Sequence, residues 1–508
     1  MTKTQTYTDL LRQRLTRINS GIFLSIILLF FISPNVFAKD ISEKLKDSVV
    51  YLQVAYYGYE QYQPWKNVEL SEGFAVGCAV DDNKVITIAS SVANAAFLQA
   101  RKADRNDYIP AKIVTLDYES NLALIELDSN SLGSDLLKPL KFNEKYVKGA
   151  SLAFYWLSAN GQMYNGRGFL DRVEVSGSSI FYSNTLTFVA AGISESTNLG
   201  QLYCLNDKPI GIASLSGKDK EADIVPAEVI NRFLDDAKDG QYNGIAMKGF
   251  VTSTLIDPAM RKYLKIPNDI HDGVYVADVF TIGTGSDVLK QGDVLLAVDD
   301  FAISPYGRYQ HKKFGSLLFD NLITAKTAGE EITFEVWRDG KRQRLEAKTK
   351  RFAAADMLVP WYEFDTQPEY AVIGGCIFQK MTKSYLTGRG DDWQGKVEPH
   401  LYNYLVNDAF KPTPQRTDIV LLSYCMPANI NIGYHQLSQL VVDKINGMKI
   451  RDMSDIPAAI ASKPESKFIV IEFEMDKPAI VLDRGQLEAA GNSISQIYGI
   501  GKLMNINK

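Results

Sequence analysis

Short apolar runs alternate with polar turn residues along the first half of the chain. From about residue 47 to residue 245, β-branched and aromatic runs are bounded by Gly, Asp, Asn and Ser, as in 48–58, 71–80, 84–89, 111–117, 121–128 and 149–157. Regularly spaced short strands of this kind predict a β-sandwich or a β-barrel. Residues 227–240 have apolar positions at helical spacing and a terminal glycine, which predicts a helix that closes this part of the chain.

The second half of the chain contains one pattern twice. Residues 246–352 read as a strand, a short helix, two strands, a helix over 314–330 and a hairpin that turns at Asp339–Gly340. Residues 369–485 repeat this order more weakly, with Asn446–Gly447 as one turn and a polar insertion near 388–415. Residues 353–368 are expected to be a linker and 486–508 a C-terminal helix or tail. Because a repeated pattern is stronger evidence than a single match, we treat these segments as two copies of one unit.

The first 38 residues differ in composition from the rest of the chain. Lys3 and three arginines precede the apolar run "GIFLSIILLFFI", and small side chains at Val36 and Ala38 follow it. This is the pattern of a secretory signal peptide, cleaved after Ala38. The alternative, an uncleaved anchor helix, is disfavoured because the apolar run is short for a hydrocarbon core of about 30 Å. We therefore expect an exported protein, most simply a periplasmic one of the bacterial envelope, with secretion as the alternative.

Charge and ligand-forming residues narrow the functional classes. The 508-residue chain has a net charge of −5, which becomes −8 once the four bases and one acid of residues 1–38 are removed. An acidic protein without a basic patch is a poor nucleic-acid binder. The four histidines are scattered and no CxxC pair occurs, so the sequence predicts no metal site and no cofactor.

Four cysteines stand inside apolar, strand-like runs, at Cys78, Cys204, Cys376 and Cys425. Two disulfides would be compatible with an oxidising compartment, and four cysteines allow three connectivities. Buried free thiols are the preferred interpretation, and the pairing stays open.

The order of these segments resembles that of the Deg/HtrA serine proteases. The order of strands and helices in 246–352 and 369–485 is similar to that of PDZ domains, and the long insertion is most similar to plant-type Deg proteases. "VITIASSVANA", "DYESNLALIEL" and "AAGISESTNLGQL" before "KPIGIAS" are similar to the segments that carry the family's catalytic histidine, aspartate and serine. The resemblance implies a mainly β protein with some α: a trypsin-like double β-barrel over 39–245, followed by PDZ-like unit 1 (246–352) and PDZ-like unit 2 (369–485).

The catalytic positions of the family have changed in this chain. Carried across residue by residue, the histidine falls on Ser90, the aspartate on Asn121 and the nucleophilic serine on Asn198. The glycine of the oxyanion turn falls on Ser196, and of the two glycines that follow the nucleophile only the second remains. That residue is Gly200, whereas the first is replaced by Leu199. The resemblance therefore predicts a degenerate catalytic site.

An argument from chemistry reaches the same conclusion. A serine hydroxyl attacks an amide only when a neighbouring base removes its proton, and histidine suits this role because its pKa lies near neutral pH. The histidines are His271, His311, His400 and His435, so the expected barrel region contains none. Loss of a working triad lowers the rate by about 10⁴ to 10⁶. Two alternatives stay open: a pair formed by Ser90 or Ser91 with a lysine such as Lys102, and a histidine that reaches across from a PDZ-like unit.

The resemblance assigns a peptide-binding role to the PDZ-like units. PDZ domains bind an extended C-terminus as an added strand, and a glycine-containing turn receives the carboxylate. The corresponding turns are Lys248–Gly249–Phe250–Val251 in unit 1 and Gly374–Gly375–Cys376–Ile377 in unit 2. Lys248 would add attraction for the carboxylate, although an exposed lysine at the start of a strand is equally ordinary. The helix predicted within 314–326 would form the other wall of the first groove, or simply pack in the core.

The sequence thus predicts an inactive protein of the HtrA/Deg type that handles other envelope proteins. The expected partners are unfolded or C-terminally exposed envelope proteins and active HtrA relatives, and the resemblance implies a homotrimer built through the start of the barrel region. The aromatic residues of "YYGYEQYQPW" would form an interface or cover the barrel. An active serine endopeptidase with a non-standard site is the alternative, and the sequence does not separate a chaperone from an adaptor.

Overall fold

The computed structural model describes residues 41–178, 180–216, 220–475 and 478–506. The predicted signal peptide, residues 1–38, lies outside the described residues. Within them, no helix is both long enough and apolar enough to cross a membrane.

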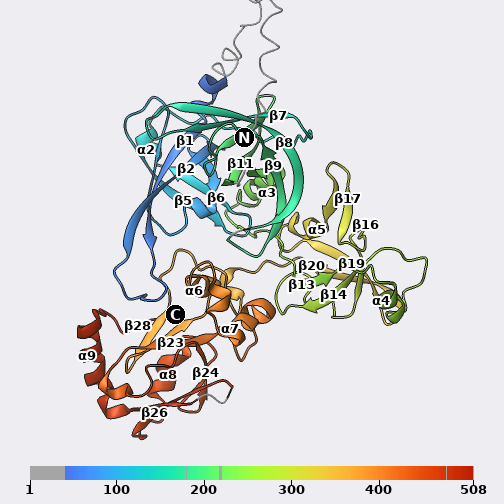
Figure 1. The fold of residues 1–508 in the computed structure, drawn as a ribbon. Coiled ribbons are helices and arrows are strands. Elements are labelled where there is room, and N and C mark those ends of the chain that lie inside the picture. Colours follow the sequence, from blue (N-terminus) through green and yellow to red (C-terminus); the bar gives the residue numbers. More distant parts are fainter. Residues whose placement is uncertain (1–40, 179, 217–219, 476–477, 507–508) are drawn as a thin grey trace, which may run out of the picture.

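Two closed six-stranded β-barrels form the first half of the protein (Figure 1). Barrel 1 has the strand order β1–β2–β3–β6–β5–β4, and barrel 2 has the order β10–β11–β12–β9–β8–β7. The strands of barrel 1 are β1 (Val49–Gly58), β2 (Glu69–Ala79), β3 (Lys84–Ile88), β4 (Ala95–Arg101), β5 (Ile109–Asp117) and β6 (Leu122–Leu127). Those of barrel 2 are β7 (Ser151–Leu157), β8 (Met163–Gly177), β9 (Asn184–Ala191), β10 (Leu202–Leu205), β11 (Lys208–Ser216) and β12 (Ala222–Pro226). The predicted double barrel is confirmed.

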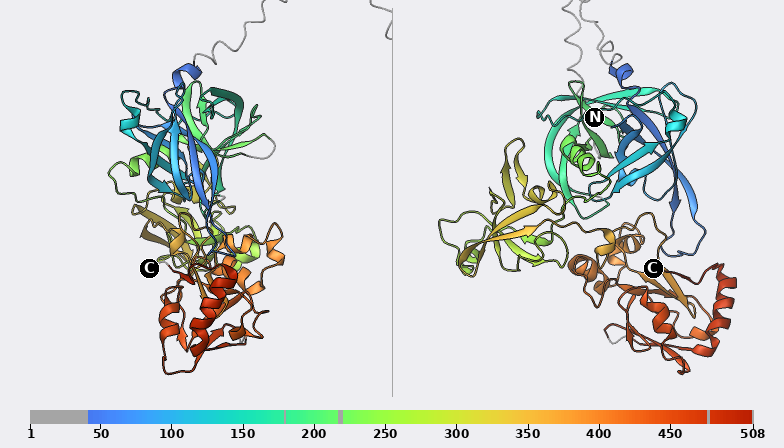
Figure 2. Two further views of the ribbon diagram at one scale, coloured as in Figure 1. Left: turned by 90° about the vertical axis from the view of Figure 1, so that its left-hand side faces the viewer. Right: turned by 180° about the vertical axis from the view of Figure 1, so that it is seen from behind.

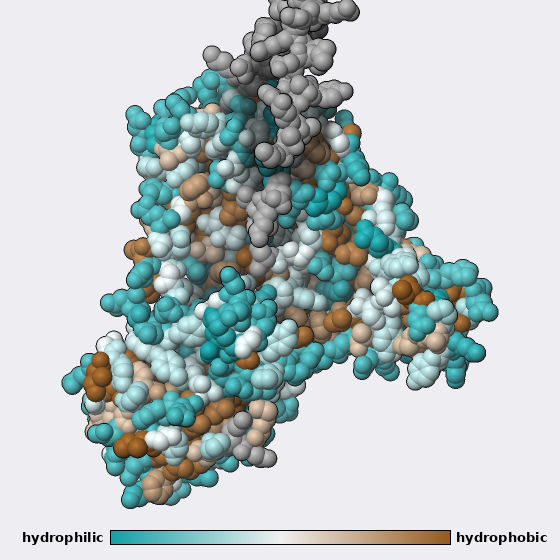
Figure 3. Space-filling model, in the orientation of Figure 1, coloured by the Kyte–Doolittle hydropathy of each residue, from teal (hydrophilic) through white to brown (hydrophobic). Residues whose placement is uncertain are grey.

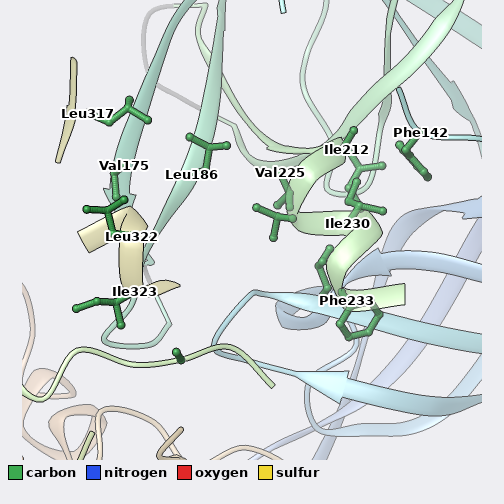
Figure 4. Close-up of a cluster of buried hydrophobic side chains, with 14 of the residues drawn as sticks. Phe142, Val175, Leu186, Ile212, Val225, Ile230, Phe233, Leu317, Leu322 and Ile323 are labelled. Carbon is green, nitrogen blue, oxygen red and sulfur yellow. The ribbon is translucent and has the colours of Figure 1, made fainter. Parts of the chain in front are cut away.

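Helices contribute little to the barrel half. Helix α2 (Ser129–Leu132) is a single turn, and α3 (Ala227–Asp236) closes barrel 2 as the sequence predicted. Ile230 and Phe233 of α3 are buried, and they belong to one cluster with Ile212 of barrel 2 and Phe142 of the connection between the barrels (Figure 4). The helix therefore seals the region where the two barrels meet.

PDZ-like unit 1 is an antiparallel sheet with the order β13–β14–β15–β19–β20. Its elements are β13 (Phe250–Ser253), α4 (Pro258–Tyr263), β14 (Val274–Val279), β15 (Val294–Val298), β16 (Phe301–Ala302), β17 (Arg308–His311), β18 (Gly315–Leu318), α5 (Asp320–Thr324), β19 (Glu331–Arg338) and β20 (Lys341–Lys348). The hairpin at Asp339–Gly340 is confirmed, and both turn residues have positive φ.

The helix predicted over 314–330 is wrong in part. Residues 315–318 form β18, which pairs with β17, and only Asp320–Thr324 is helical. The apolar residues of this segment instead pack against barrel 2. Leu317, Leu322 and Ile323 lie in one buried cluster with Val175 and Leu186, and Figure 4 shows Leu322 next to Val175.

PDZ-like unit 2 repeats this sheet and extends it. Its order is β27–β26–β24–β23–β22–β21–β28, so β22 to β27 correspond to the sheet of unit 1, and β21 and β28 are added beside β22. The elements are β21 (Tyr370–Ile373), β22 (Cys376–Lys380), α6 (Lys383–Thr387), α7 (Pro399–Asn403), β23 (Val420–Cys425), β24 (Leu440–Ile445), β25 (Met448–Lys449), α8 (Asp455–Ala461), β26 (Phe468–Phe473), β27 (Ile480–Asp483), α9 (Leu487–Tyr498) and β28 (Met504–Asn505). The Asn446–Gly447 turn and helix α8 are as predicted.

The hairpin of β1 and β2 forms an arm that reaches PDZ-like unit 2 (Figures 1 and 2). At its end the Tyr62 hydroxyl donates to the carbonyl of Tyr385 (2.7 Å), and Gln379 donates to the carbonyl of Gln61 (2.8 Å). Trp65 packs edge-on against Tyr370, with ring centroids 6.0 Å apart. The aromatic residues near the start of the barrel region thus contact unit 2 of the same chain.

Candidate functional site

Ser90 and Asn121 lie in contact at the rim of barrel 1. Strand β3 ends in the 3₁₀ turn Ala89–Ser91, and Asn121 immediately precedes β6, the strand that pairs with β3. The side-chain oxygen of Asn121 accepts the backbone N–H of Ser90 (2.9 Å), and its carbonyl accepts the N–H of Ala89 (3.1 Å). Asn121 has φ 55°, a conformation that Asn tolerates well. The amide thus caps the turn that carries Ser90.

The loop that contains Asn198 packs on the strands that lead to this rim. The carbonyl of Leu199 accepts the N–H of Val76 (2.9 Å), and the N–H of Gly200 donates to Ala213 (2.8 Å). Gly200 has φ +82°, and a Cβ on it would lie 2.0 Å from the carbonyl oxygen of Val76. Only glycine allows this approach. Ser90 and Asn121 therefore belong to barrel 1, whereas Asn198 lies in the loop before β10 of barrel 2, whose next residues contact β2.

The side chains at these positions lack the means for acyl transfer. Asn121 supplies a neutral amide, and Asn198 has no nucleophilic atom. Ser91 donates its hydroxyl proton to the carbonyl of Ile88 (2.6 Å). Lys102 is 1% exposed, and its ammonium donates to the carbonyl and carboxylate of Asp135 (2.7 and 2.5 Å) and to the carbonyl of Leu136 (3.2 Å). All three of its protons are directed away from the serines, which argues against the Ser–Lys alternative.

His311 is the histidine that approaches the barrels. Its ring stacks on Phe314 (4.6 Å between centroids), and its Nδ1 accepts the backbone N–H groups of Lys313 and Phe314 (3.2 Å each). It lines a cavity of about 330 Å³ between barrel 2 and unit 1 with Glu228 and Thr185. Among the contacts of the described residues, none joins His311 to Ser90, Asn121 or Asn198. The imidazole therefore stabilises the hairpin of β17 and β18 in unit 1.

Two buried carboxylates beside this rim were missed by the sequence analysis. Asp117 is fully buried and accepts the Ser120 hydroxyl (2.6 Å) and the Tyr242 hydroxyl. Glu119 accepts from the guanidinium of Arg351 (2.6 Å), which lies at the end of PDZ-like unit 1. Burial and the neighbouring Asp117 raise the pKa of Glu119 to about 9, whereas hydrogen bonds and Arg351 lower the pKa of Asp117 despite its burial. The pair thus links barrel 1 to Tyr242, just before unit 1, and to Arg351 at the end of the unit.

The linker between the two PDZ-like units also crosses this rim. Asp365 accepts the backbone N–H of Asn94 (2.7 Å) and the hydroxyl of Tyr118 (2.5 Å). Phe364 packs on Tyr118, with ring centroids 4.5 Å apart. Asn94 and Tyr118 flank the segments that carry Ser90 and Asn121, so the linker lies beside the degenerate site. This contact joins residues 271 positions apart, and no local pattern announces it.

In PDZ-like unit 1, the predicted peptide-binding turn is engaged within the chain. Lys248 forms an ion pair with Asp320 (2.6 Å), and their side chains are 13% and 8% exposed. Asp320 also accepts from Asn184 of barrel 2 (2.9 Å). The N–H of Gly249 donates to Thr284 (2.9 Å), Phe250 is fully buried and Val251 is exposed at 38%. The cavity at Lys248 and Asp320 holds only about 20 Å³.

In PDZ-like unit 2, the predicted turn joins two paired strands. Gly374 and Gly375 both have positive φ and connect β21 to β22, so the edge of β22 is already paired with β21. Cys376 and Ile377 are fully buried. The side chain of Asn431 donates to the carbonyls of Gly374 (2.7 Å) and Met426 (2.8 Å). Peptide binding at these four residues stays a prediction, and it would require β21 to leave.

The described residues contain no group of His, Cys, Asp and Glu side chains arranged to hold a metal ion. The prediction of no metal and no cofactor is not tested further.

Comparison with known proteins agrees with this architecture. Residues 359–505 match the sequence profile of the PDZ domain family, a range that includes α9 and β28. Protease Do-like 4, mitochondrial, of Arabidopsis thaliana is 23% identical over 460 residues, which cover 89% of this chain and 84% of the relative. Protease Do-like 2, chloroplastic, of the same plant is 25% identical over 446 residues, covering 86% and 71%. The solved structure of HtrA-type protease AlgW with decapeptide superimposes with a TM-score of 0.47 and 16% identity, over 62% of this chain and 99% of that one.

Two closed six-stranded β-barrels followed by a PDZ region define the structural class of this chain. The relatives narrow this class further, because they match across both the barrels and the PDZ region. The chain is thus similar to Deg/HtrA-type proteases over the barrels and the PDZ region.

Proposed function

We propose that this protein is an inactive member of the Deg/HtrA family that binds polypeptides without cleaving them. The observation that carries the proposal is the chemistry of the rim, where Ser90, Asn121 and Asn198 replace the base, the acid and the nucleophile. The Asn121 amide oxygen accepts the N–H of Ser90. It therefore stabilises the turn, and position 121 supplies no carboxylate to support a base.

Binding would be divided between the barrel cleft and the PDZ region. Unfolded or C-terminally exposed proteins of the bacterial envelope are the proposed clients, bound as added strands with their carboxylates at the glycine turns. Active relatives in the same family are proposed as further partners, and a homotrimer as the assembly. Export to the periplasm is proposed on the composition of residues 1–38 alone. The work would be that of a chaperone, an adaptor or a regulator in protein quality control.

A protease assay on an unfolded substrate tests the proposal. The purified full chain should release no fragments from reduced, unfolded casein, and its rate should equal that of the Ser90→Ala/Ser91→Ala variant. An active HtrA-type protease assayed in parallel shows that the substrate is cleavable. Turnover that is lost in the double variant would establish the alternative, an active endopeptidase with a non-standard site.

A second pair of measurements separates the forms of binding. A chaperone should suppress aggregation of a chemically unfolded protein at stoichiometric concentration. An adaptor should instead capture a few C-terminal peptides on an array and leave aggregation unchanged. Failure of both would contradict the binding function.

A further inference from the structure

Two of the four cysteines face each other across neighbouring strands of PDZ-like unit 2. Cys376 on β22 is the direct register partner of Cys425 on β23. The N–H of Met426 donates to the carbonyl of Gly375 at 2.8 Å, so the residues next to the cysteines make the hydrogen bond. Cys376 and Cys425 therefore occupy a non-hydrogen-bonded position of the ladder, where facing Cα atoms lie about 4.5 Å apart.

This position meets the geometric requirement for a disulfide. Disulfides join cysteines whose Cα atoms lie about 4.4–6.8 Å apart with side chains directed toward one another. Side chains of a register pair point to the same face of the sheet. Both cysteines are buried, at 0% and 4% exposure, and a hydrogen bond to Cys425, together with burial, raises the pKa of the Cys376 thiol. Both cysteines are free thiols in the structure, and their side chains lie on the same face of the sheet at paired positions.

The other two cysteines lack this relationship. Cys78 lies on β2, which pairs with β1 and β3, whereas Cys204 lies on β10, which pairs with β7 and β11. The Cys78 thiol donates to the carbonyl of Gly200 (3.5 Å). Burial raises the pKa of both thiols, so neither forms a thiolate readily. The ladder thus favours one bond, Cys376 to Cys425, over each of the three arrangements in which all four cysteines pair.

We propose that Cys376 and Cys425 form a disulfide when the chain folds in the presence of a disulfide oxidant, and that Cys78 and Cys204 remain thiols. The oxidant is a small-molecule or protein disulfide such as oxidised glutathione. A thiolate of one cysteine attacks the oxidant and releases one thiol, and the second cysteine then displaces the other half from the mixed disulfide. Two thiols lose two protons and two electrons, and one molecule of oxidised glutathione becomes two of reduced glutathione.

The bond would form during folding rather than afterwards. In the folded chain both sulfur atoms are shielded from an incoming oxidant, and burial of Cys376 disfavours its thiolate. Once formed, the bond would fix β22 to β23 beside the Gly374–Gly375 turn, the ladder on which β21 rests. It would also close a loop of about 50 residues that carries the whole insertion, and a loop of this length favours strong stabilisation of the folded state.

Refolding in a defined thiol buffer tests the proposal. The full chain is unfolded and reduced, refolded in mixed reduced and oxidised glutathione, alkylated and digested without reductant. We expect one cross-linked peptide pair, Cys376 with Cys425, and alkylated Cys78 and Cys204. The proposal would be overturned if all four cysteines were alkylated in a chain that has regained its native fluorescence. A bond from Cys78 to Cys204 would overturn it as well.

Thermal unfolding supplies a second measurement with matched variants. Protein refolded in reductant should melt about 10 °C lower in unit 2 than protein refolded with oxidised glutathione, given the loop length and domain size. Cys425→Ala should abolish this dependence on reductant, and Cys204→Ala should preserve it. An equal response to reductant in both variants would contradict the assignment, as would a wild-type melting temperature that reductant leaves unchanged.

Discussion

Replacement of Gly200 by alanine should destabilise the barrels strongly, although it changes no group of catalytic type. Gly200 lies two residues after Asn198, in the loop that contacts β2. Its φ of +82° costs an L-residue about 1–2 kcal/mol. The added Cβ would also lie 2.0 Å from the carbonyl oxygen of Val76 and 3.0 Å from the hydroxyl oxygen of Thr87.

The steric part of this loss in stability is large because the atom that a Cβ on Gly200 would meet, the carbonyl oxygen of Val76, belongs to the backbone. The Val76 carbonyl accepts the Thr87 hydroxyl (2.8 Å), and the Val76 N–H donates to Leu199 (2.9 Å), so this segment cannot retreat without breaking buried hydrogen bonds. Overpacking of this kind adds about 1–3 kcal/mol. With the backbone strain included, we expect a loss of about 4 kcal/mol in the free energy of unfolding.

Gly149 offers a matched control in the same half of the protein. Its φ is +75°, and a Cβ there would meet nothing within 4 Å. Gly149→Ala should therefore cost only the backbone strain, about 1–2 kcal/mol. Urea denaturation followed by tryptophan fluorescence gives both values. Equal losses for the two variants would refute the claim that close packing of the barrels fixes Gly200.

Two further predictions concern buried charges. Because burial raises the pKa of Glu119 to about 9 from an ordinary value of 4.5, folding takes up a proton between these values. The free energy of unfolding should therefore fall as pH rises through this window. Urea titrations at a series of pH values should show a smaller fall for Glu119→Gln. An equal dependence of the unfolding free energy on pH in both proteins would contradict the raised pKa of Glu119. Asp320→Asn leaves Lys248 buried without its counter-charge and should cost about 3–5 kcal/mol. Asp300→Asn, at a carboxylate that is 93% exposed, should cost less than about 1 kcal/mol, and similar losses in the two variants would contradict a buried pair.

The sequence predicted the elements whose residues carry a local pattern. Alternating apolar residues gave the barrel strands, and helical spacing gave α3 and α8. The prediction of one helix over 314–330 was wrong in part because the spacing of its apolar residues also fits a helix. In the structure the segment packs against barrel 2, near Val175 and Leu186, as a strand followed by a short helix. Local periodicity does not record which distant surface a segment will meet.

The chemistry of the candidate site stays a prediction from the sequence, and its connections to other segments were not predicted. The change to Ser90, Asn121 and Asn198 is visible in the sequence, because residue type alone decides whether a base is present. The contacts of Asp320 with Asn184 and of Arg351 with Glu119 join segments far apart in the chain. Such pairings depend on domain docking, which neither spacing nor composition specifies.

Exposed apolar residues are scattered over the protein and also gather on PDZ-like unit 2 (Figure 3). Ile432, Phe468 and Ile497 are 75%, 45% and 69% exposed there. A client that uses this surface would not compete with β21, whereas a client that adds as a strand to β22 would. Competition between a bound peptide and β21 therefore distinguishes the two modes.

The two PDZ-like units differ in what a peptide must displace. In unit 2 the edge of β22 is paired over four residues with β21, so an entering strand replaces backbone hydrogen bonds with equivalent ones and gains little. In unit 1 the sheet ends at β13, whose ladder within the described residues is to β14 alone. The obstacle there is electrostatic, because Lys248 is held by Asp320 and Asp320 by Asn184 of barrel 2. A peptide carboxylate that takes Lys248 would leave Asp320 buried without its cation. Binding at unit 1 therefore carries the cost of loosening the unit from barrel 2, which couples peptide capture to the position of this unit.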